Sequence, residues 1–370
     1  MVRLVAPGPV PVPWEVAQEL AAPLIHHRGD GFRRLLAEVQ GGLRWVCQTQ
    51  EPVVVLTGSG SVGMEATLLS LATPLRPVVY VGGGKFGERW GEIGRAYGLE
   101  MIELEVAWGE AVEPARLAAL LEARPDVAAV ALSACETSTG VMHPVEEVAR
   151  VVKGRDRAPQ LWVDGITAVG VCDLAMDALG LDALVMGSQK VFALPPGLAM
   201  VAVREQTLAT AQGLPRYSLD LQREWAEQRK GQTLFTPATG LLMALAASLR
   251  GLRAQGLEAT WARHDDLAKF ARAGLEGLGL RLVARRPASA VSAAWLPEGV
   301  DARRLLARCQ ELGTVLADGQ GPLAGKIVRV GHLGSHTRQD LLLALANLGQ
   351  ALREQGALDD PSAGVRAALL

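Results

Sequence analysis

Between residues 51 and 203, short apolar runs alternate with stretches in which apolar residues recur at a helical period. The runs are apolar at nearly every position, which predicts strands that are buried on both faces of a sheet. Alternation of such strands with helices is typical of an α/β layer architecture. We expect strands at residues 53–56, 78–81, 101–106, 127–132, 160–163, 183–186 and 198–203, and helices at 62–72, 86–97, 114–123 and 145–153.

The pattern changes after about residue 240, where short strands are mixed with helices and no longer alternate with them strictly. This change predicts a second, smaller domain of the α+β class. We expect helices at residues 241–255, 257–278, 301–312 and 337–354, and strands at 280–284, 291–296, 314–317 and 327–330. The last residues, 359–370, contain Asp-Asp-Pro-Ser-Ala-Gly, which predicts a frayed tail.

Composition narrows the class of protein without indicating a substrate. The chain has 370 residues, of which 49% are hydrophobic and 21% are charged, and its formal net charge is −2. These values exclude a disordered protein and give no electrostatic reason to expect a nucleic-acid or membrane partner. Because the four cysteines are widely separated, neither a disulfide framework nor a metal site is expected. The sequence shows no signal peptide or membrane-spanning run, and a cytoplasmic protein is therefore expected.

A glycine-rich turn at residues 57–63 (Thr-Gly-Ser-Gly-Ser-Val-Gly) separates the first expected strand from the helix that follows it. Backbone N–H groups at the N-terminus of a helix can bind a phosphate, although such turns are equally common as plain connections. No Gly-Lys-Ser/Thr follows, which excludes a Walker A loop. The second strand is followed by Gly-Gly-Gly at residues 82–84 and not by the acidic residue that dinucleotide-binding folds carry there.

Three charged residues occupy expected strands or their ends. Asp164 ends an apolar strand, where ligands gather in open α/β sheets, although an aspartate there often only caps a turn. Lys190 follows Gly-Ser-Gln at the end of another strand, and burial would favour its neutral, nucleophilic amine. Arg329 lies in a strand that leads into a glycine turn, and its guanidinium can bind a carboxylate through two hydrogen bonds. The plainer interpretations are a lysine at a sheet edge and an arginine in a surface ion pair.

These motifs occur in one order: the glycine turn, the strand-end aspartate, Gly-Ser-Gln-Lys at 187–190 and Arg-Val-Gly-His-Leu-Gly at 329–334. In this order the sequence resembles the class V pyridoxal-phosphate aminotransferases, and within them the alanine/serine–glyoxylate (serine–pyruvate) branch. The resemblance extends from Ala-Pro-Gly-Pro at 6–9 to the final helix. It implies a fold-type I pyridoxal-phosphate-dependent transferase with a mostly parallel central sheet. The implied organisation is an N-terminal segment of the active site (1–20), a large cofactor-binding domain (21–240), a small C-terminal domain (241–358) and the tail (359–370).

The resemblance also implies a role for each residue that matches a family motif. Lys190 would hold pyridoxal 5′-phosphate as an imine and move a proton between the substrate Cα and the cofactor, and Asp164 would keep the pyridine nitrogen protonated. Arg329 would bind the substrate α-carboxylate, with the backbone of Gly8 nearby. The other implied cofactor contacts are Gly60, Ser61, Gln189 and the partner subunit's Thr236 at the phosphate, and Phe86, Ser138 and Ile166 at the ring. Phe86 also fits a plain core position, and Ser138 also fits a turn cap.

The implied reaction is a ping-pong transamination between alanine or serine and glyoxylate or pyruvate, in a homodimer with shared active sites. Aspartate as the donor is an alternative, and it would need a further cation such as Arg28 or Arg33. A cysteine desulfurase is a second alternative, which the position of Cys309 within an expected helix disfavours. A cofactor-binding protein without activity is a third, disfavoured because the lysine, aspartate and arginine motifs occur together.

Two segments do not contribute to this assignment. Thr233 stands where some relatives have a tyrosine, three residues before Thr236, so one phosphate hydrogen bond is expected to be missing or replaced. The segment His26-His27-Arg28 matches the branch in sequence, but its residue types indicate no chemical role.

Overall fold

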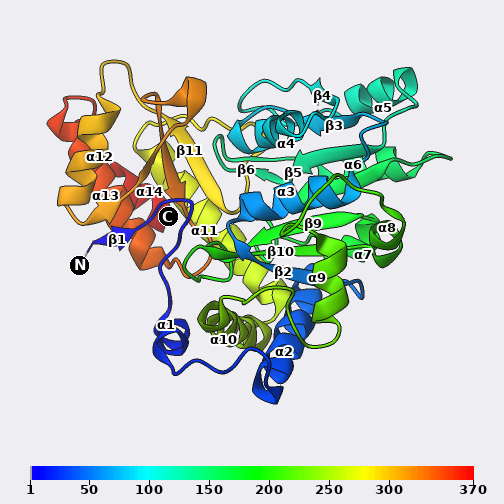
Figure 1. Ribbon diagram of the computed structural model, residues 1–370. Helices are drawn as coiled ribbons and strands as arrows, with labels where there is room; N and C mark the ends of the chain where they lie inside the picture. The colour runs from blue at the N-terminus through cyan, green and yellow to red at the C-terminus, as the bar shows by residue number, and fades with distance from the viewer. Residues whose placement is uncertain (1) are drawn as a thin grey trace.

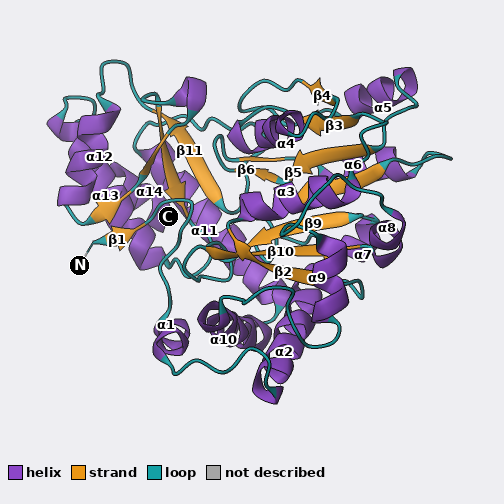
Figure 2. Ribbon diagram, in the orientation of Figure 1, coloured by secondary structure: helices purple, strands orange, loops and turns teal. Residues whose placement is uncertain are grey.

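The computed structural model describes residues 2–370, and a seven-stranded sheet forms its centre (Figures 1 and 2). The strand order is β2–β10–β9–β8–β5–β3–β4. Strand β10 is antiparallel to both of its neighbours, and the other pairs are parallel. The predicted α/β class with a mostly parallel sheet is confirmed. The strands are β2 (Val53–Gly58), β3 (Val78–Val81), β4 (Met101–Leu104), β5 (Ala129–Ser133), β8 (Gln160–Asp164), β9 (Ala183–Gly187) and β10 (Gly197–Val203).

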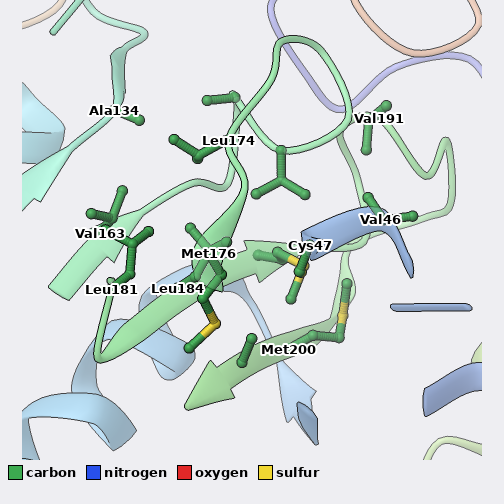
Figure 3. Packing of buried hydrophobic residues seen from close by; sticks show 14 of the residues in the cluster. Val46, Cys47, Ala134, Val163, Leu174, Met176, Leu181, Leu184, Val191 and Met200 are labelled. Carbon is green, nitrogen blue, oxygen red and sulfur yellow. The ribbon is translucent and has the colours of Figure 1, made fainter. Parts of the chain in front are cut away.

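Helices cover both faces of this sheet because successive residues of each strand point to opposite sides. In β8, Leu161 and Val163 join one apolar cluster and Trp162 joins the other. Figure 3 shows part of the first cluster, which includes Cys47, Val163, Leu184 and Met200. The helices of the first cluster are α2 (Asp30–Cys47), α5 (Pro114–Ala123), α6 (Val145–Lys153), α7 (Met176–Leu179) and α10 (Thr239–Gln255). Those of the second are α3 (Gly60–Leu71), α4 (Lys85–Ala96), α8 (Glu205–Thr210) and α9 (Leu221–Gln228).

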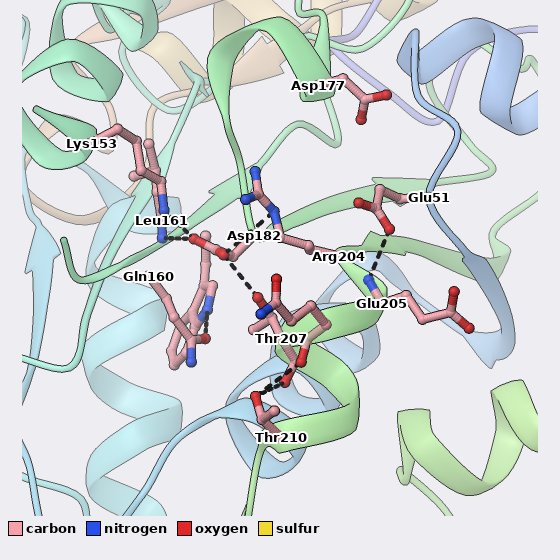
Figure 4. A network of polar contacts seen from close by, with 12 residues as sticks. Glu51, Lys153, Gln160, Leu161, Asp177, Asp182, Arg204, Glu205, Thr207 and Thr210 are labelled. Carbon is pink, nitrogen blue, oxygen red and sulfur yellow. Dashed lines mark hydrogen bonds and ion pairs between the residues drawn. The ribbon is translucent and has the colours of Figure 1, made fainter. Parts of the chain in front are cut away.

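Asp182 fixes the start of β9 against its neighbours (Figure 4). Its carboxylate accepts hydrogen bonds from the Leu161 N–H of β8 at 2.8 Å and the Thr207 hydroxyl of α8 at 2.9 Å, and it pairs with Lys153 of α6. A buried charge held by several donors resists displacement. The network therefore sets the register of β8 and β9 at the end of the sheet opposite to the ends where Asp164 and Lys190 lie.

A second group of elements follows α10. Strands β11 (Val291–Trp295), β14 (Ile327–Gly331) and β13 (Ala317–Asp318) form an antiparallel sheet, and β1 (Arg3–Leu4) pairs with β12 (Thr314–Val315). Helices α11 (Leu257–Gly277), α12 (Ala302–Glu311) and α13 (Arg338–Glu354) pack beside them in a separate apolar cluster. Over the part of the chain described, no helix is both long and apolar enough to cross a membrane.

The structure corrects several sequence-based expectations. Helices α1 (Trp14–Ala21) and α2 were not predicted, and the strand expected at 280–284 is reduced to a single bridge between Leu282 and Ala294. The tail is not frayed, because Ala363–Leu369 forms helix α14, which packs against α11 and α13. Two glycines permit this close approach: a Cβ on Gly364 would lie 2.6 Å from Leu278 Cγ, and one on Gly277 would lie 2.4 Å from Ala367 Cβ.

We predict that Gly364→Val destabilises the α11–α14 contact by about 1–3 kcal/mol, because the new side chain must overlap Leu278 and the Gly274 carbonyl. Hydrogen exchange of the α14 amides, followed by mass spectrometry, should accelerate, and the urea midpoint should fall. The matched control is Gly41→Ala in α2, where no atom lies within 4 Å of the added Cβ. That change should leave α14 exchange as in the wild type, and equal exchange in both variants would contradict the packing role of Gly364.

Candidate active site

The ends of β8 and β9 bring the predicted lysine and aspartate to the same edge of the sheet. Asp164 is the last residue of β8, and Lys190 follows the end of β9 by three residues. Both side chains are buried, with 5% and 7% of their surface exposed. The two strands are parallel neighbours, so their carboxyl ends meet, as in other ligand sites of open α/β sheets.

The N-terminal segment closes over the Lys190 amine. Nζ donates a hydrogen bond to the carbonyl of Pro7, and a Cβ on Gly8 would lie 2.7 Å from Nζ. Gly8 has a φ of 106°, which also favours glycine. The pKa of Lys190 is lowered to about 8, mainly by burial and also by the charge of Arg329, while Cys135 and Asp164 act in the opposite direction. A neutral amine is therefore accessible near physiological pH.

Asp164 has two hydrogen-bond donors, and both are neutral. The Ser133 hydroxyl donates to Oδ2 at 3.0 Å, and the Ile166 N–H donates to Oδ1 at 2.9 Å. Burial raises the pKa of this carboxyl, and the two hydrogen bonds lower it. Neutral donors compensate the negative charge of a buried carboxylate only in part. Asp164 is therefore suited to bind a cationic atom of a ligand.

The glycine turn opens onto the N-terminus of α3. This helix begins at Gly60, and the side chain of its N-cap, Ser59, makes no capping hydrogen bond. A Cβ on Gly60 would lie 2.3 Å from Ile166 Cδ1, so the turn and the segment after β8 approach closely. The Ser61 hydroxyl accepts a hydrogen bond from Arg89 at 3.0 Å. The buried Gln189 Oε1 has no hydrogen-bond partner among residues 2–370, as expected where a ligand completes the site.

Ser138 and Phe86 meet at a carboxylate that the sequence reasoning missed. The Ser138 hydroxyl donates to Glu136 Oε1 at 2.5 Å and accepts from the Lys85 N–H at 3.1 Å. The Phe86 N–H, in the first turn of α4, donates to Glu136 Oε2 at 3.1 Å. Thr137, also missed, has its hydroxyl 3.0 Å from that of Thr167, after β8. A glutamate directly after the mostly apolar run 129–135 was the available signal, since a charged residue beside a buried segment is seldom unpaired.

Arg329 reaches the site from the three-stranded sheet. Its Nε donates to the Asp318 carbonyl at 2.7 Å, and Nη1 donates to the Thr137 carbonyl at 3.1 Å. The side chain is buried, and burial lowers the pKa of the guanidinium, opposed by the charges of Glu136 and Asp318. The structure thus places both Asp164 and Arg329 near enough to Lys190 for their charges to shift its pKa.

The remaining predicted residue, Thr236, lies in the loop between α9 and α10. It lines an open hollow of about 680 Å³ with Leu20, Leu24, His26 and His27. Its neighbour Ala238 donates from its N–H to the Thr57 hydroxyl at 3.3 Å, where the glycine turn begins.

Comparison with known protein families identifies the family of this chain. The family described as aminotransferase class V matches residues 18–322. The chain belongs to this family. It is a pyridoxal-phosphate-dependent aminotransferase, and the resemblance noted in the sequence is confirmed.

Two curated relatives span nearly the whole aminotransferase chain. The "Soluble hydrogenase, small subunit" of Synechococcus is 37% identical over 99% of this chain and 97% of the relative. The L-aspartate–glyoxylate aminotransferase of Paracoccus denitrificans is 33% identical over 98% of this chain and 94% of the relative.

Solved structures show the same fold. An aspartate aminotransferase of subgroup IV from Thermus thermophilus has a TM-score of 0.89 and 34% identity, covering 95% of this chain and 99% of its own. An alanine–glyoxylate aminotransferase from Nostoc has a TM-score of 0.90 and 29% identity, covering 95% and 96%. These neighbours confirm the fold-type I assignment.

The residues of the aminotransferase site fit pyridoxal phosphate. A buried amine of lowered pKa suits the cofactor aldehyde, and a carboxylate with only neutral donors suits the pyridine nitrogen. The N-terminus of α3, where the N-cap side chain makes no capping hydrogen bond, suits the phosphate. Among residues 2–370, no group of three or more His, Cys, Asp and Glu side chains is placed to hold a metal ion.

We predict that the apoprotein's Lys190 reacts with formaldehyde and cyanoborohydride in its neutral form, with half-maximal rate near pH 8. The rate should fall roughly tenfold per pH unit well below that value, because the ammonium form is not nucleophilic. Peptide mass spectrometry after timed labelling measures the rate at each pH. The exposed Lys269 of α11, followed in the same digest, is the control. A Lys190 profile that coincides with that of Lys269 would contradict the effect of burial.

Proposed function

We propose that this aminotransferase transfers the amino group of alanine or serine to glyoxylate or pyruvate by a ping-pong mechanism. The observation that carries the proposal is the buried Lys190 amine, which lies within the fields of Asp164 and Arg329. An amine, an anion and a fixed guanidinium together match an α-amino acid: the guanidinium binds its carboxylate, and the amine can take its α-proton.

Bound pyridoxal phosphate would supply an electron sink for the negative charge that develops at the substrate Cα. Asp164 would hold a proton on the ring nitrogen, which its burial beside neutral donors favours. Arg329 would bind the substrate carboxylate with the donors that remain beyond its bonds to Asp318 and Thr137. Lys190 would carry the proton away from Cα and return it, a role for which a pKa near 8 is suited. The segment around Pro7 would cover the amine and limit access of water.

A small donor is favoured by the positions of two arginines. Arg28 donates to Gln232 at 2.7 Å, and Arg33 pairs with Asp30 at 2.7 Å, so both cations considered for an aspartate side chain have partners elsewhere. The alanine–glyoxylate enzyme of Nostoc supports the same donor class. The Paracoccus and Thermus relatives carry names that favour aspartate, which keeps it as the second candidate.

Cysteine desulfurase chemistry is disfavoured by the state of Cys309. This thiol is fully buried in α12, and burial raises its pKa to about 12. A catalytic cysteine of that class needs an accessible thiolate, which this environment opposes.

We predict that the enzyme loaded with pyridoxal phosphate loses its visible absorbance in a single turnover with alanine or serine and regains it with glyoxylate or pyruvate. Stopped-flow traces over a matrix of donors and acceptors measure this, with aspartate as the competing donor. Lys190→Ala should slow the change by about 10²- to 10⁴-fold or more, since the base is then missing. A kcat/KM ten times higher for aspartate than for alanine would contradict the proposal and identify aspartate as the donor.

We also propose a cytoplasmic homodimer in which Thr236 completes the partner's phosphate site. The four cysteines are free thiols, as expected in a reducing compartment. The support for the dimer is an apolar face around the hollow that Thr236 lines, where Leu24 is 71% exposed beside the half-exposed Leu20 and Ile25. Exposed apolar clusters of this kind mark interaction surfaces.

We predict that Leu24→Asp shifts the protein to a monomer and weakens pyridoxal phosphate binding, because each site would lose its partner contact. Sedimentation velocity and cofactor titration measure the two effects. Leu75→Asp is the matched control, since Leu75 is 83% exposed in the loop after α3 and should alter neither. An unchanged sedimentation coefficient for Leu24→Asp would contradict this interface.

A further inference from the structure

Glu136 is a fully buried carboxylate that the proposed reaction does not use. Oε1 accepts from the N–H and hydroxyl of Ser138 at 3.0 and 2.5 Å, and Oε2 accepts from the N–H groups of Phe86 and Gly87 at 3.1 and 2.8 Å. Three of these partners are backbone N–H groups, which can only donate, and the Ser138 hydroxyl is the fourth. Burial raises the pKa of Glu136, and the hydrogen bonds from Ser138 and Gly87 lower it. The ionised form accepts at both oxygens and therefore fits all four partners.

Two of the donors belong to the first turn of α4, where backbone N–H groups have no partner within the helix. Glu136 therefore caps α4 from outside, and a negative charge at a helix N-terminus also complements its dipole. The atoms around this cap are closely packed. A Cβ on Gly84 would lie 2.3 Å from Glu136 Cδ, and one on Gly87 would lie 2.4 Å from the Val81 carbonyl at the end of β3. The backbone that carries Phe86 is thus held between β3 and this carboxylate.

The next residue along the chain links the same cluster to the arginine. The Thr137 carbonyl accepts from Arg329 Nη1 at 3.1 Å. The charge of Glu136 raises the pKa of Arg329 against the effect of burial, so the carboxylate also offsets the cost of placing a guanidinium there. Glu136 is therefore bonded to the backbone of Phe86 in α4, and the next residue, Thr137, is bonded to Arg329 of the three-stranded sheet.

We infer that Glu136 is a positioning residue of the aminotransferase: it fixes Phe86 at the cofactor ring and, through Thr137, Arg329 at the substrate carboxylate. The inference rests on the proposed function, since it takes Phe86 and Arg329 as the ring and carboxylate contacts.

The test replaces Glu136 by Gln, whose amide would point an N–H₂ group at donors and break at least one side of the cap. At saturating pyridoxal phosphate we expect a weaker circular-dichroism band of the bound cofactor, because its ring is held less rigidly. The cofactor Kd should rise by about 10- to 100-fold, and the KM for alanine should rise more than kcat falls, as misplacement of binding groups produces. The matched control is Glu146→Gln, an exposed glutamate of α6 paired with Arg150 at 3.5 Å, which should resemble the wild type.

Glu136→Asp keeps the charge on a side chain shorter by one methylene, and it should restore part of the dichroism band and of the KM. If Glu136→Gln is not recovered folded, Glu136→Asp compared with the wild type decides the question by the same two measurements. A variant that loses thermal stability but keeps the wild-type dichroism, Kd and KM would overturn the positioning role. A wild-type protein that binds no pyridoxal phosphate, or does not transaminate alanine, would instead overturn the proposed function.

Discussion

The burial of the Lys190 amine is the constraint on which the rest of the site depends. An ammonium group loses hydration when it is buried, and the protein must either offset that loss or shift the group to its neutral form. Both happen here: the Pro7 carbonyl accepts from Nζ, and the pKa falls to about 8. The carbonyl is available because the N-terminal segment crosses the site, held by the β1–β12 pair and by the hydrogen bond from the Gly331 N–H to the Val5 carbonyl at 2.8 Å.

Glu136 and Asp164 are both buried carboxylates at the same edge of the sheet, but they have different roles because their hydrogen-bond partners differ. Glu136 is saturated by four donors of its own chain and therefore behaves as part of the scaffold. Asp164 has two neutral donors and retains capacity for a cation, as a group that meets a ligand must. The number of donors around each group, more than its burial, separates a structural acid from a functional one.

The sequence allowed the sheet and its charged residues to be predicted, because both leave local patterns. The inner strands of the central sheet are buried on both faces and therefore appear in the sequence as apolar runs, and Asp164 and Lys190 interrupt that pattern at strand ends. The edge strand β4 is partly exposed and contains Glu103. Helix α2 was missed although Phe32, Leu36, Val39 and Leu43 recur at helical spacing and are buried. The role of Glu136 was missed because two of its four donors, the N–H groups of Phe86 and Gly87, belong to a helix about 50 residues away along the chain, and no local pattern records that contact. The hydroxyl of Ser138 faces Glu136, a direction that a matched motif cannot specify.

The position of Arg329, for which we propose binding of the substrate carboxylate, depends on how the two sheets pack together. Arg329 belongs to β14 of the three-stranded sheet, where Nε is held by Asp318, yet Nη1 is held by the Thr137 carbonyl beside the seven-stranded sheet. A relative movement of the two sheets would stretch one of these bonds and rotate the guanidinium, whose planar donors require a fixed orientation. Because Thr137 follows Glu136 in the chain, and Glu136 is hydrogen-bonded to the first turn of α4, the position of Arg329 is tied to that of α4. In the proposed function, this link would align the carboxylate site with the cofactor site.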